Sequence, residues 1–164
     1  MEVQHDNYCI KPGYRANLVQ NTLDSSSARE YWTAERIASS RLYQYDVYRL
    51  ASELIRKNKA RKVADIGCGP ALKSKKFLLP FCDELILFDQ KTTKDVVKDI
   101  LPAVRFIPTN FEQMNIEIED RFDLIICADV LEHLIDPDVC LQFIQNHLSD
   151  TGVAVLSTPE RDML

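Results

Sequence analysis

The sequence predicts a doubly wound α/β fold, in which a parallel sheet is covered by helices on both faces. Two patterns lead to this class. Short apolar runs alternate along the 164 residues with stretches of helical period, and helices that connect strands in this way produce a parallel sheet with right-handed crossovers. The apolar runs also lack polar residues at alternate positions, which is typical of strands buried on both faces. We expect the strand order 3-2-1-4-5.

The N-terminal part of the chain precedes the predicted sheet. Residues 1–24 have no sustained period and contain the turn signal Pro12-Gly13, so we expect an irregular arm. Residues 31–57 have helical period, with apolar residues spaced by three and four positions and a cluster of aromatic residues. We therefore predict a helical lid over residues 25–60.

Residues 61–164 carry the alternating pattern and form the predicted core. Each strand is a short apolar run, and each helix is a longer stretch with one apolar face. We expect five strands at residues 63–66, 85–88, 104–107, 122–128 and 152–158, and helices at residues 71–79, 93–101 and 137–148.

The composition excludes several classes of protein. A length of 164 residues suits one domain, and the formal net charge of −5 disfavours a general nucleic-acid binder, which usually has a basic face. No apolar run is long enough to cross a bilayer. The five cysteines are odd in number with no CxxC pair, and the first residues are polar rather than signal-like. We expect reduced thiols and a cytoplasmic location.

Candidate functional residues follow the predicted strands, because ligands of open parallel sheets bind at the carboxyl ends of the strands. Glycine in Gly67-Cys68-Gly69 allows a sharp turn and a close approach of the backbone to a ligand. A dinucleotide-binding loop would have a third glycine where this chain has Leu72. The acidic Asp65 before the loop suits a ligand that carries an ammonium group. A tight turn without a ligand is the alternative.

Asp89 ends the second predicted strand, 20 residues after Gly69. A carboxylate at that place can accept hydrogen bonds from both hydroxyls of a ribose. The alternative is a solvated aspartate at a strand end. The glycine loop on the neighbouring strand favours the ribose.

Three motifs together resemble the class I S-adenosylmethionine-dependent methyltransferases, which have a Rossmann-like fold. They are Val-Ala-Asp-Ile-Gly-Cys-Gly, Leu-Phe-Asp ending at Asp89, and Phe-Asp-Leu-Ile-Ile-Cys-Ala-Asp-Val-Leu-Glu-His-Leu, in the family's order. The resemblance covers residues 31–164. The segment Leu-Ser-Thr-Pro-Glu-Arg-Asp at 156–162 is similar to a subgroup associated with glycan or natural-product modification.

The resemblance implies a role for individual residues toward S-adenosylmethionine. The methionine end would be held by Asp65, by the backbone of Gly67 and Gly69, and by Asp129 below it. Asp89 would bind the ribose, and Asn110 and Phe111 would bind the adenine. Cys68 and Gln90 are assigned to the same cofactor site. The sequence departs from the family at Ala71, where a third glycine is usual, and at Asn110, where aspartate is usual.

The segment Asp129-Val130-Leu131-Glu132-His133 carries the third group of candidates. On a short helix, Asp129, Glu132 and His133 would share one face. This is similar to the Glu-x-x-Glu-His metal site of ubiquinone-pathway O-methyltransferases and small-RNA 2′-O-methyltransferases. The alternative, which we prefer, is a pocket floor without a metal, so we assign no metal ligand. His133 is the candidate catalytic residue, as a general base.

The predicted function is methyl transfer from S-adenosylmethionine to a small-molecule or glycan acceptor, with O-, N- and C-methylation not distinguished. A pseudoenzyme or subunit that needs a partner chain, and a small-RNA methyltransferase, are alternatives. The absence of a glycine at Leu72 disfavours a nicotinamide-dependent oxidoreductase. The family's sheet has two further strands, for which residues 159–164 are too few. We therefore expect a longer natural protein, and self-association of this chain through the exposed sheet edge.

Overall fold

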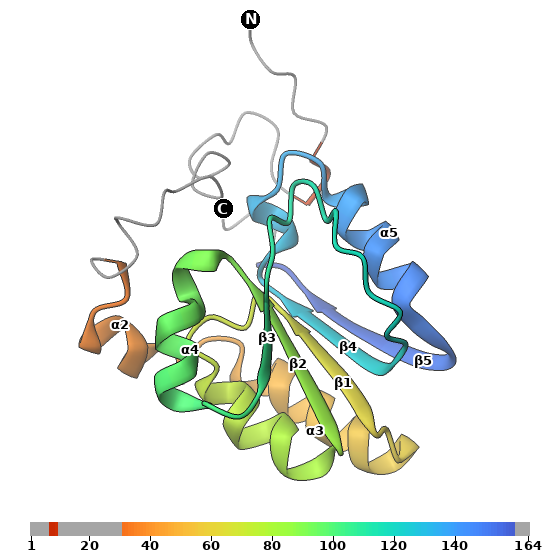
Figure 1. Ribbon diagram of the computed structural model, residues 1–164, viewed down its shortest axis with the longest axis horizontal. Coiled ribbons are helices and arrows are strands. Elements are labelled where there is room, and N and C mark those ends of the chain that lie inside the picture. The colour runs from red at the N-terminus through yellow and green to blue at the C-terminus, as the bar shows by residue number, and fades with distance from the viewer. Residues whose placement is uncertain (1–6, 10–30, 160–164) are drawn as a thin grey trace, which may run out of the picture.

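The computed structural model describes residues 7–9 and 31–159 (Figure 1). Five parallel strands form one sheet in the order β3-β2-β1-β4-β5, which confirms the predicted order. The strands are β1 (Lys62–Ile66), β2 (Glu84–Asp89), β3 (Arg105–Pro108), β4 (Phe122–Ala128) and β5 (Leu148–Ser157).

The register of the sheet brings the predicted site residues to one edge. Ile66 at the end of β1 pairs with Phe88 of β2 on one side and with Cys127 of β4 on the other. The residues that follow these three strands therefore leave the sheet side by side.

The helical segments lie between the strands. They are α2 (Ala34–Ser39), α3 (Tyr45–Asn58), the π-helical turn η2 (Ser74–Leu78), the 3₁₀ turns η3 (Leu79–Phe81), η4 (Lys91–Thr93) and η5 (Leu131–His133), α4 (Lys94–Ile100) and α5 (Pro137–His147). No helix among the described residues is long and apolar enough to span a membrane.

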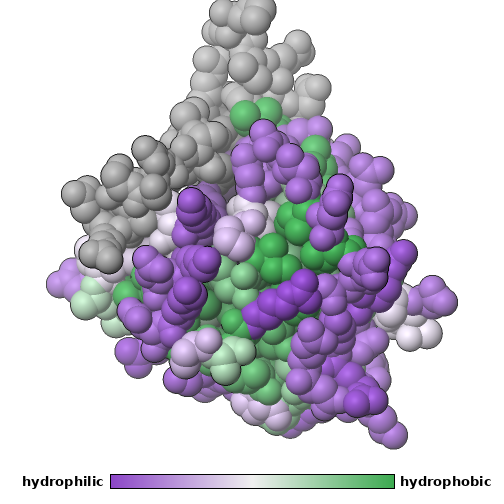
Figure 2. All heavy atoms as spheres, viewed as in Figure 1, coloured by the Kyte–Doolittle hydropathy of each residue, from purple (hydrophilic) through white to green (hydrophobic). Residues whose placement is uncertain are grey.

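Both faces of the sheet are buried, as the apolar strands predict. Val63 of β1 belongs to the apolar cluster on the side of α3, η2 and α4, and the next residue, Ala64, belongs to the cluster on the side of α5. Figure 1 shows α3 and α5 on opposite sides of the sheet. Figure 2 shows hydrophobic side chains gathered over the middle of the molecule, with hydrophilic ones around them.

The predicted helix over residues 31–57 is not continuous. A turn separates α2 from α3, and Gln44 at that turn has a left-handed backbone with φ of 52°. Thr33 caps α2, since its side chain accepts a hydrogen bond from the Arg36 backbone. Hydrogen bonds from Gln44 to Asp129 and from Lys73 to the Ser40 carbonyl hold this turn. The Pro12-Gly13 turn and most of the predicted arm lie outside the described residues.

Two other element boundaries differ from the predictions. The helix predicted over residues 71–79 is a π-helical turn followed by a 3₁₀ turn that continues through Pro80, because proline fits the first turn of a new helical segment. The last strand begins at Leu148, directly after α5, with an irregularity in its pairing with β4. β5 is the outer strand of the sheet, and Leu156 on it is 43% exposed.

Candidate functional site

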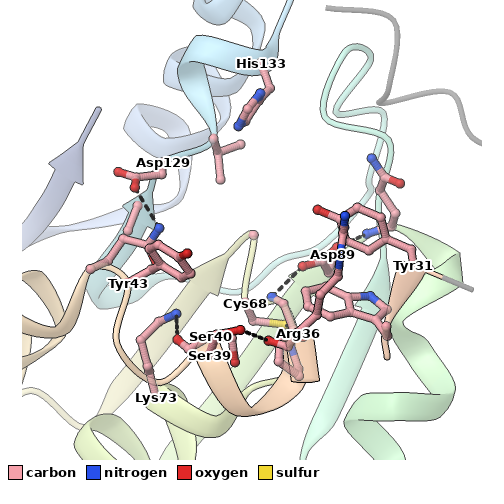
Figure 3. Close-up of a pocket in the computed structure, with 18 of the residues that line it drawn as sticks. Tyr31, Arg36, Ser39, Ser40, Tyr43, Cys68, Lys73, Asp89, Asp129 and His133 are labelled. Atoms are coloured by element: carbon pink, nitrogen blue, oxygen red, sulfur yellow. Dashed lines mark hydrogen bonds between the residues drawn. The ribbon is translucent and has the colours of Figure 1, made fainter. Parts of the chain in front are cut away.

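A cleft of about 840 Å³ lies at the edge where β1, β2 and β4 end (Figure 3). Its volume is within the usual range for small-molecule sites. The predicted residues in its lining are Gly67, Cys68, Gly69, Asp89, Gln90, Phe111, Asp129 and His133. The structure thus brings eight of the ten predicted site residues together, and it places Asp65 and Asn110 outside the lining.

The glycine loop after β1 is a tight turn in which Gly67 and Gly69 both have left-handed backbones, with φ of 75° and 54°. A Cβ on Gly67 would lie 2.2 Å from Cγ2 of Val130, and a Cβ on Gly69 would lie 3.3 Å from the Trp32 ring. Ala71, at the position of the family's third glycine, is also left-handed, with φ of 58°. The loop therefore uses its two glycines to pass close to neighbouring side chains.

Asp89 is buried beside the glycine loop. Its Oδ2 accepts a hydrogen bond from the Gly69 backbone at 2.7 Å, and its Oδ1 accepts from the Gln90 backbone at 2.7 Å and from Oγ1 of Thr93 at 3.0 Å. Burial raises the pKa of Asp89, and these hydrogen bonds oppose the rise. A carboxylate has about four acceptor positions, so Asp89 retains capacity for a ligand.

Asp65 lies beneath the cleft with no exposed surface. The Tyr48 hydroxyl donates to its two oxygens at 3.0 and 3.1 Å, and Oγ of Ser74 donates at 2.5 Å. Burial raises the pKa of Asp65 to about 6, against the effect of these hydrogen bonds. In the structure this carboxylate joins β1 to α3 and η2 under the glycine loop, and its contact with the methionine end stays a prediction.

Asp129 follows β4 with a left-handed backbone, φ 54°. Its Oδ2 accepts from Nε2 of Gln44 at 2.7 Å, and its Oδ1 accepts from Oγ of Ser157 at 2.9 Å. Because Asp129 precedes η5, the predicted helix that would carry Asp129, Glu132 and His133 on one face is wrong. Within residues 7–9 and 31–159, no group of three or more His, Cys, Asp or Glu residues could hold a metal ion.

His133 ends η5, and its imidazole points into the cleft (Figure 3). Burial lowers the pKa of the imidazole, which favours its neutral, proton-accepting form. Oε1 of Glu132 lies 3.7 Å from Nε2 of His133, and Oε2 of Glu132 has no hydrogen-bond partner among the described residues. Burial raises the pKa of Glu132 to about 7.

The residues after β3 separate into two kinds. Phe111 is 5% exposed and lines the cleft. Asn110 is exposed, and its Oδ1 accepts a hydrogen bond from the Glu112 backbone at 3.0 Å. The Asn110 side chain therefore stabilises the local turn in this structure, and its contact with adenine stays a prediction.

Trp32 and Tyr43, which belong to the aromatic cluster of the predicted lid, line the cleft, whereas sequence reasoning missed Gln44 from the turn after α2. It also missed Lys73, whose Nζ donates to the Ser40 carbonyl at 2.8 Å and lies 5.1 Å from the centre of the Tyr48 ring. Burial lowers the pKa of Lys73, while Asp65 and Asp129 oppose the change. No local pattern marks these residues, because their partners are 33 to 85 positions away.

The sequence and the fold match known proteins. Residues 34–164 match a family model described as a methyltransferase domain. The chain is 26% identical over 109 residues to the ubiquinone biosynthesis O-methyltransferase of Glaesserella parasuis serovar 5 (strain SH0165), a match that covers 62% of this chain and 46% of the relative. The chain thus spans about half the length of this curated relative.

Solved structures share the fold. An O-methyltransferase family protein from Burkholderia thailandensis has a TM-score of 0.62 and 19% identity, over 84% of this chain and 42% of that protein. The amino pentose methyltransferase CalS10 from Micromonospora echinaspora, solved with SAM bound, has a TM-score of 0.61 and 17% identity, over 78% and 57%. The plantazolicin methyltransferase BpumL, in complex with SAH, has a TM-score of 0.62 and 18% identity, over 88% and 60%.

Proposed function

Because the chain belongs to the methyltransferase-domain family, which its residues 34–164 match, we propose that it binds S-adenosylmethionine and takes part in methyl transfer to a small-molecule acceptor of natural-product or sugar type. The names of the relatives, which refer to ubiquinone, an amino pentose and plantazolicin, support an acceptor of this kind rather than RNA. The chain spans less than two thirds of each of these proteins. The activity is therefore proposed for the whole protein.

The observation that carries the proposal is the pairing of the glycine loop with Asp89 at one side of the cleft. Gly67, Cys68 and Gly69 line the cleft, so the backbone of the loop lies within reach of a ligand held by main-chain groups. The Asp89 carboxylate lines the same cleft, and its remaining acceptor position, on Oδ2, can take a hydrogen bond from a ribose hydroxyl. The residues present thus fit S-adenosylmethionine.

Other residues would bind the two ends of the cofactor. Phe111 offers an apolar face to the adenine, and Gln90 lies beside the ribose position. At the opposite end, the cleft has the carboxylate of Asp129 and the ammonium of Lys73, which suit the amino and carboxylate groups of the methionine moiety. S-adenosylmethionine, when bound, supplies a methyl group on a positively charged sulfur.

His133 and the wall of the cleft would act on the acceptor. The neutral imidazole can accept a proton from an acceptor hydroxyl or amine in the cleft. Trp32 and Tyr43, from the segment over the cleft, limit the access of water and orient the acceptor. Alignment of the two reactants is the main contribution that the protein can make to a displacement of this kind.

Isothermal titration of the chain with S-adenosylhomocysteine and with NAD tests the proposal. We expect binding of S-adenosylhomocysteine and none of NAD. Asp89→Ala should weaken the affinity by about 10- to 100-fold, since hydrogen bonds to a charged group are lost. Asp99→Ala, which removes an exposed carboxylate from α4, is the matched control and should bind within about twofold of the parent. Failure of the parent to bind, or an unchanged affinity in Asp89→Ala, would refute the proposed site.

A further inference from the structure

A short N-terminal segment, Asn7–Cys9, lies against the turn that carries His133. Asn7 is 6% exposed, and its Nδ2 donates hydrogen bonds to the carbonyls of Leu131, at 2.9 Å, and Leu134. These partners are 124 and 127 positions away in the sequence. The two carbonyls stand on either side of His133.

Both N–H hydrogens and the oxygen of the Asn7 amide take part in hydrogen bonds. Its two N–H hydrogens serve the two carbonyls, and its Oδ1 accepts from the Cys9 backbone at 2.8 Å. A side chain with its donors and acceptor all engaged and buried has one well-defined position. It therefore fixes the two carbonyls relative to each other.

The turn itself has few internal bonds. The His133 backbone donates to the Val130 carbonyl at 2.9 Å, and the Leu134 backbone donates to the Leu131 carbonyl at 3.3 Å. Three-residue 3₁₀ turns have poor hydrogen-bond geometry and are weak alone. Among the described residues, the amide of Asn7 thus adds two buried hydrogen bonds to the two backbone hydrogen bonds of the turn.

The neighbours of Asn7 extend the contact. The Tyr8 hydroxyl donates to Oδ1 of Asp138 at 2.8 Å, in the first turn of α5. Cys9 packs against the apolar cluster that contains Leu131. The pKa of its thiol is raised by burial and then by the charge of Glu132.

We propose that Asn7 is a positioning residue for His133: its amide holds the carbonyls of Leu131 and Leu134 and thereby fixes the direction of the imidazole in the cleft. The catalytic importance of that direction rests on the proposed function. A misplacement of about 1 Å in a reacting group can reduce a rate about 100-fold, so a turn held from both sides is suited to a catalytic side chain.

The test compares Asn7→Ala and Asn7→Asp with Asn58→Ala, which changes an exposed asparagine at the end of α3. Asn7→Asp keeps the size of the side chain but places an oxygen against the two carbonyls. Tyr8→Phe removes only the contact with Asp138. The chain has three histidines, so the imidazole signals of His133 and His147 are readily separated by NMR.

We expect both Asn7 variants to shift or broaden the His133 imidazole signals and leave those of His147 unchanged. Hydrogen exchange of the His133 amide should become about tenfold faster or more, because the opening of this turn becomes easier. Affinity for S-adenosylhomocysteine should stay within about twofold of the parent in the Asn7 variants. Asn58→Ala and Tyr8→Phe should keep the parent His133 signals.

Unchanged His133 signals in both Asn7 variants would overturn the proposal. A loss of S-adenosylhomocysteine affinity well beyond twofold in the Asn7 variants would also overturn it, because Asn7 would then support the whole cleft rather than this turn. If the parent chain does not bind S-adenosylhomocysteine, the proposed function fails, while the His133 signals still test the positioning by Asn7.

Discussion

Replacing Gly67 by alanine should destabilise the fold through two separable effects. The backbone at Gly67 has φ of 75°, and a Cβ there would lie 2.2 Å from Cγ2 of Val130. An L-residue held in the left-handed region costs about 1–2 kcal/mol. Ordinary van der Waals contacts begin near 3.4 Å, so one of the two groups must move by about an ångström.

The overlap adds to the backbone cost. Inserting a methyl group into a packed site costs about 1–3 kcal/mol, and Val130 is 7% exposed and branched at Cβ, so it cannot swing away freely. The sum predicts that Gly67→Ala lowers the free energy of unfolding by about 2–5 kcal/mol. Gly69→Ala should cost less, about 1–2 kcal/mol, because its Cβ would lie 3.3 Å from the edge of the Trp32 ring.

A double-mutant cycle separates the two effects. The free energies of unfolding of Gly67→Ala, Val130→Ala and the double variant are measured by urea denaturation. Val130→Ala removes the atom that the new Cβ would meet, so the double variant should be about 1–3 kcal/mol more stable than the sum of the single effects predicts. Strict additivity would refute the overlap and leave only the backbone cost at Gly67.

Three other variants test the electrostatics and the backbone. Asp65→Asn should remove a pH dependence of stability, because the pKa of Asp65 is 3.8 in the unfolded chain and about 6 in the folded one. As pH rises from about 4 to 6, the free energy of unfolding of the parent should fall by about 2–3 kcal/mol relative to the variant, as measured by urea unfolding at each pH. Lys73→Met should weaken S-adenosylhomocysteine about tenfold in calorimetry but leave 5′-methylthioadenosine, which lacks the amino-acid end, within about twofold; equal losses would contradict the assigned role. Lys59→Gly, at the left-handed C-cap of α3, should raise the free energy of unfolding by about 0.5–1 kcal/mol, and a loss of stability would count against backbone strain there.

The sequence predicted the sheet because its strands are determined locally. Buried apolar runs such as those of β1 and β4 need no distant partner to be recognised, and their order is the usual one for doubly wound folds. The break between α2 and α3 was not predictable in this way. Gln44 adopts a left-handed backbone, and its side chain contacts Asp129 across 85 positions, which helical period does not encode.

In the candidate site, too, the locally determined features were predictable and those set by distant contacts were not. The positions that follow strands, Gly67, Asp89 and Asp129, were predicted because the parallel topology fixes them at one edge. The direction in which each side chain points was not predicted. The Asp65 carboxylate is directed to Tyr48 because a buried charge requires hydrogen-bond donors, and those donors come from elements that the strand pattern does not describe.

The hydrogen bond between Asn7 and the Leu131 carbonyl also has a consequence for the order in which the protein is made. Asn7 is synthesised 124 residues before Leu131, a delay of roughly 6–25 s at about 5–20 residues per second. During that interval β1 and β2 emerge with Gly67 and Asp89, while the acceptors of the Asn7 amide do not yet exist. On a ribosome, β1 and β2 are therefore made first, and the turn with His133 can be held by Asn7 only after Leu134 has been added.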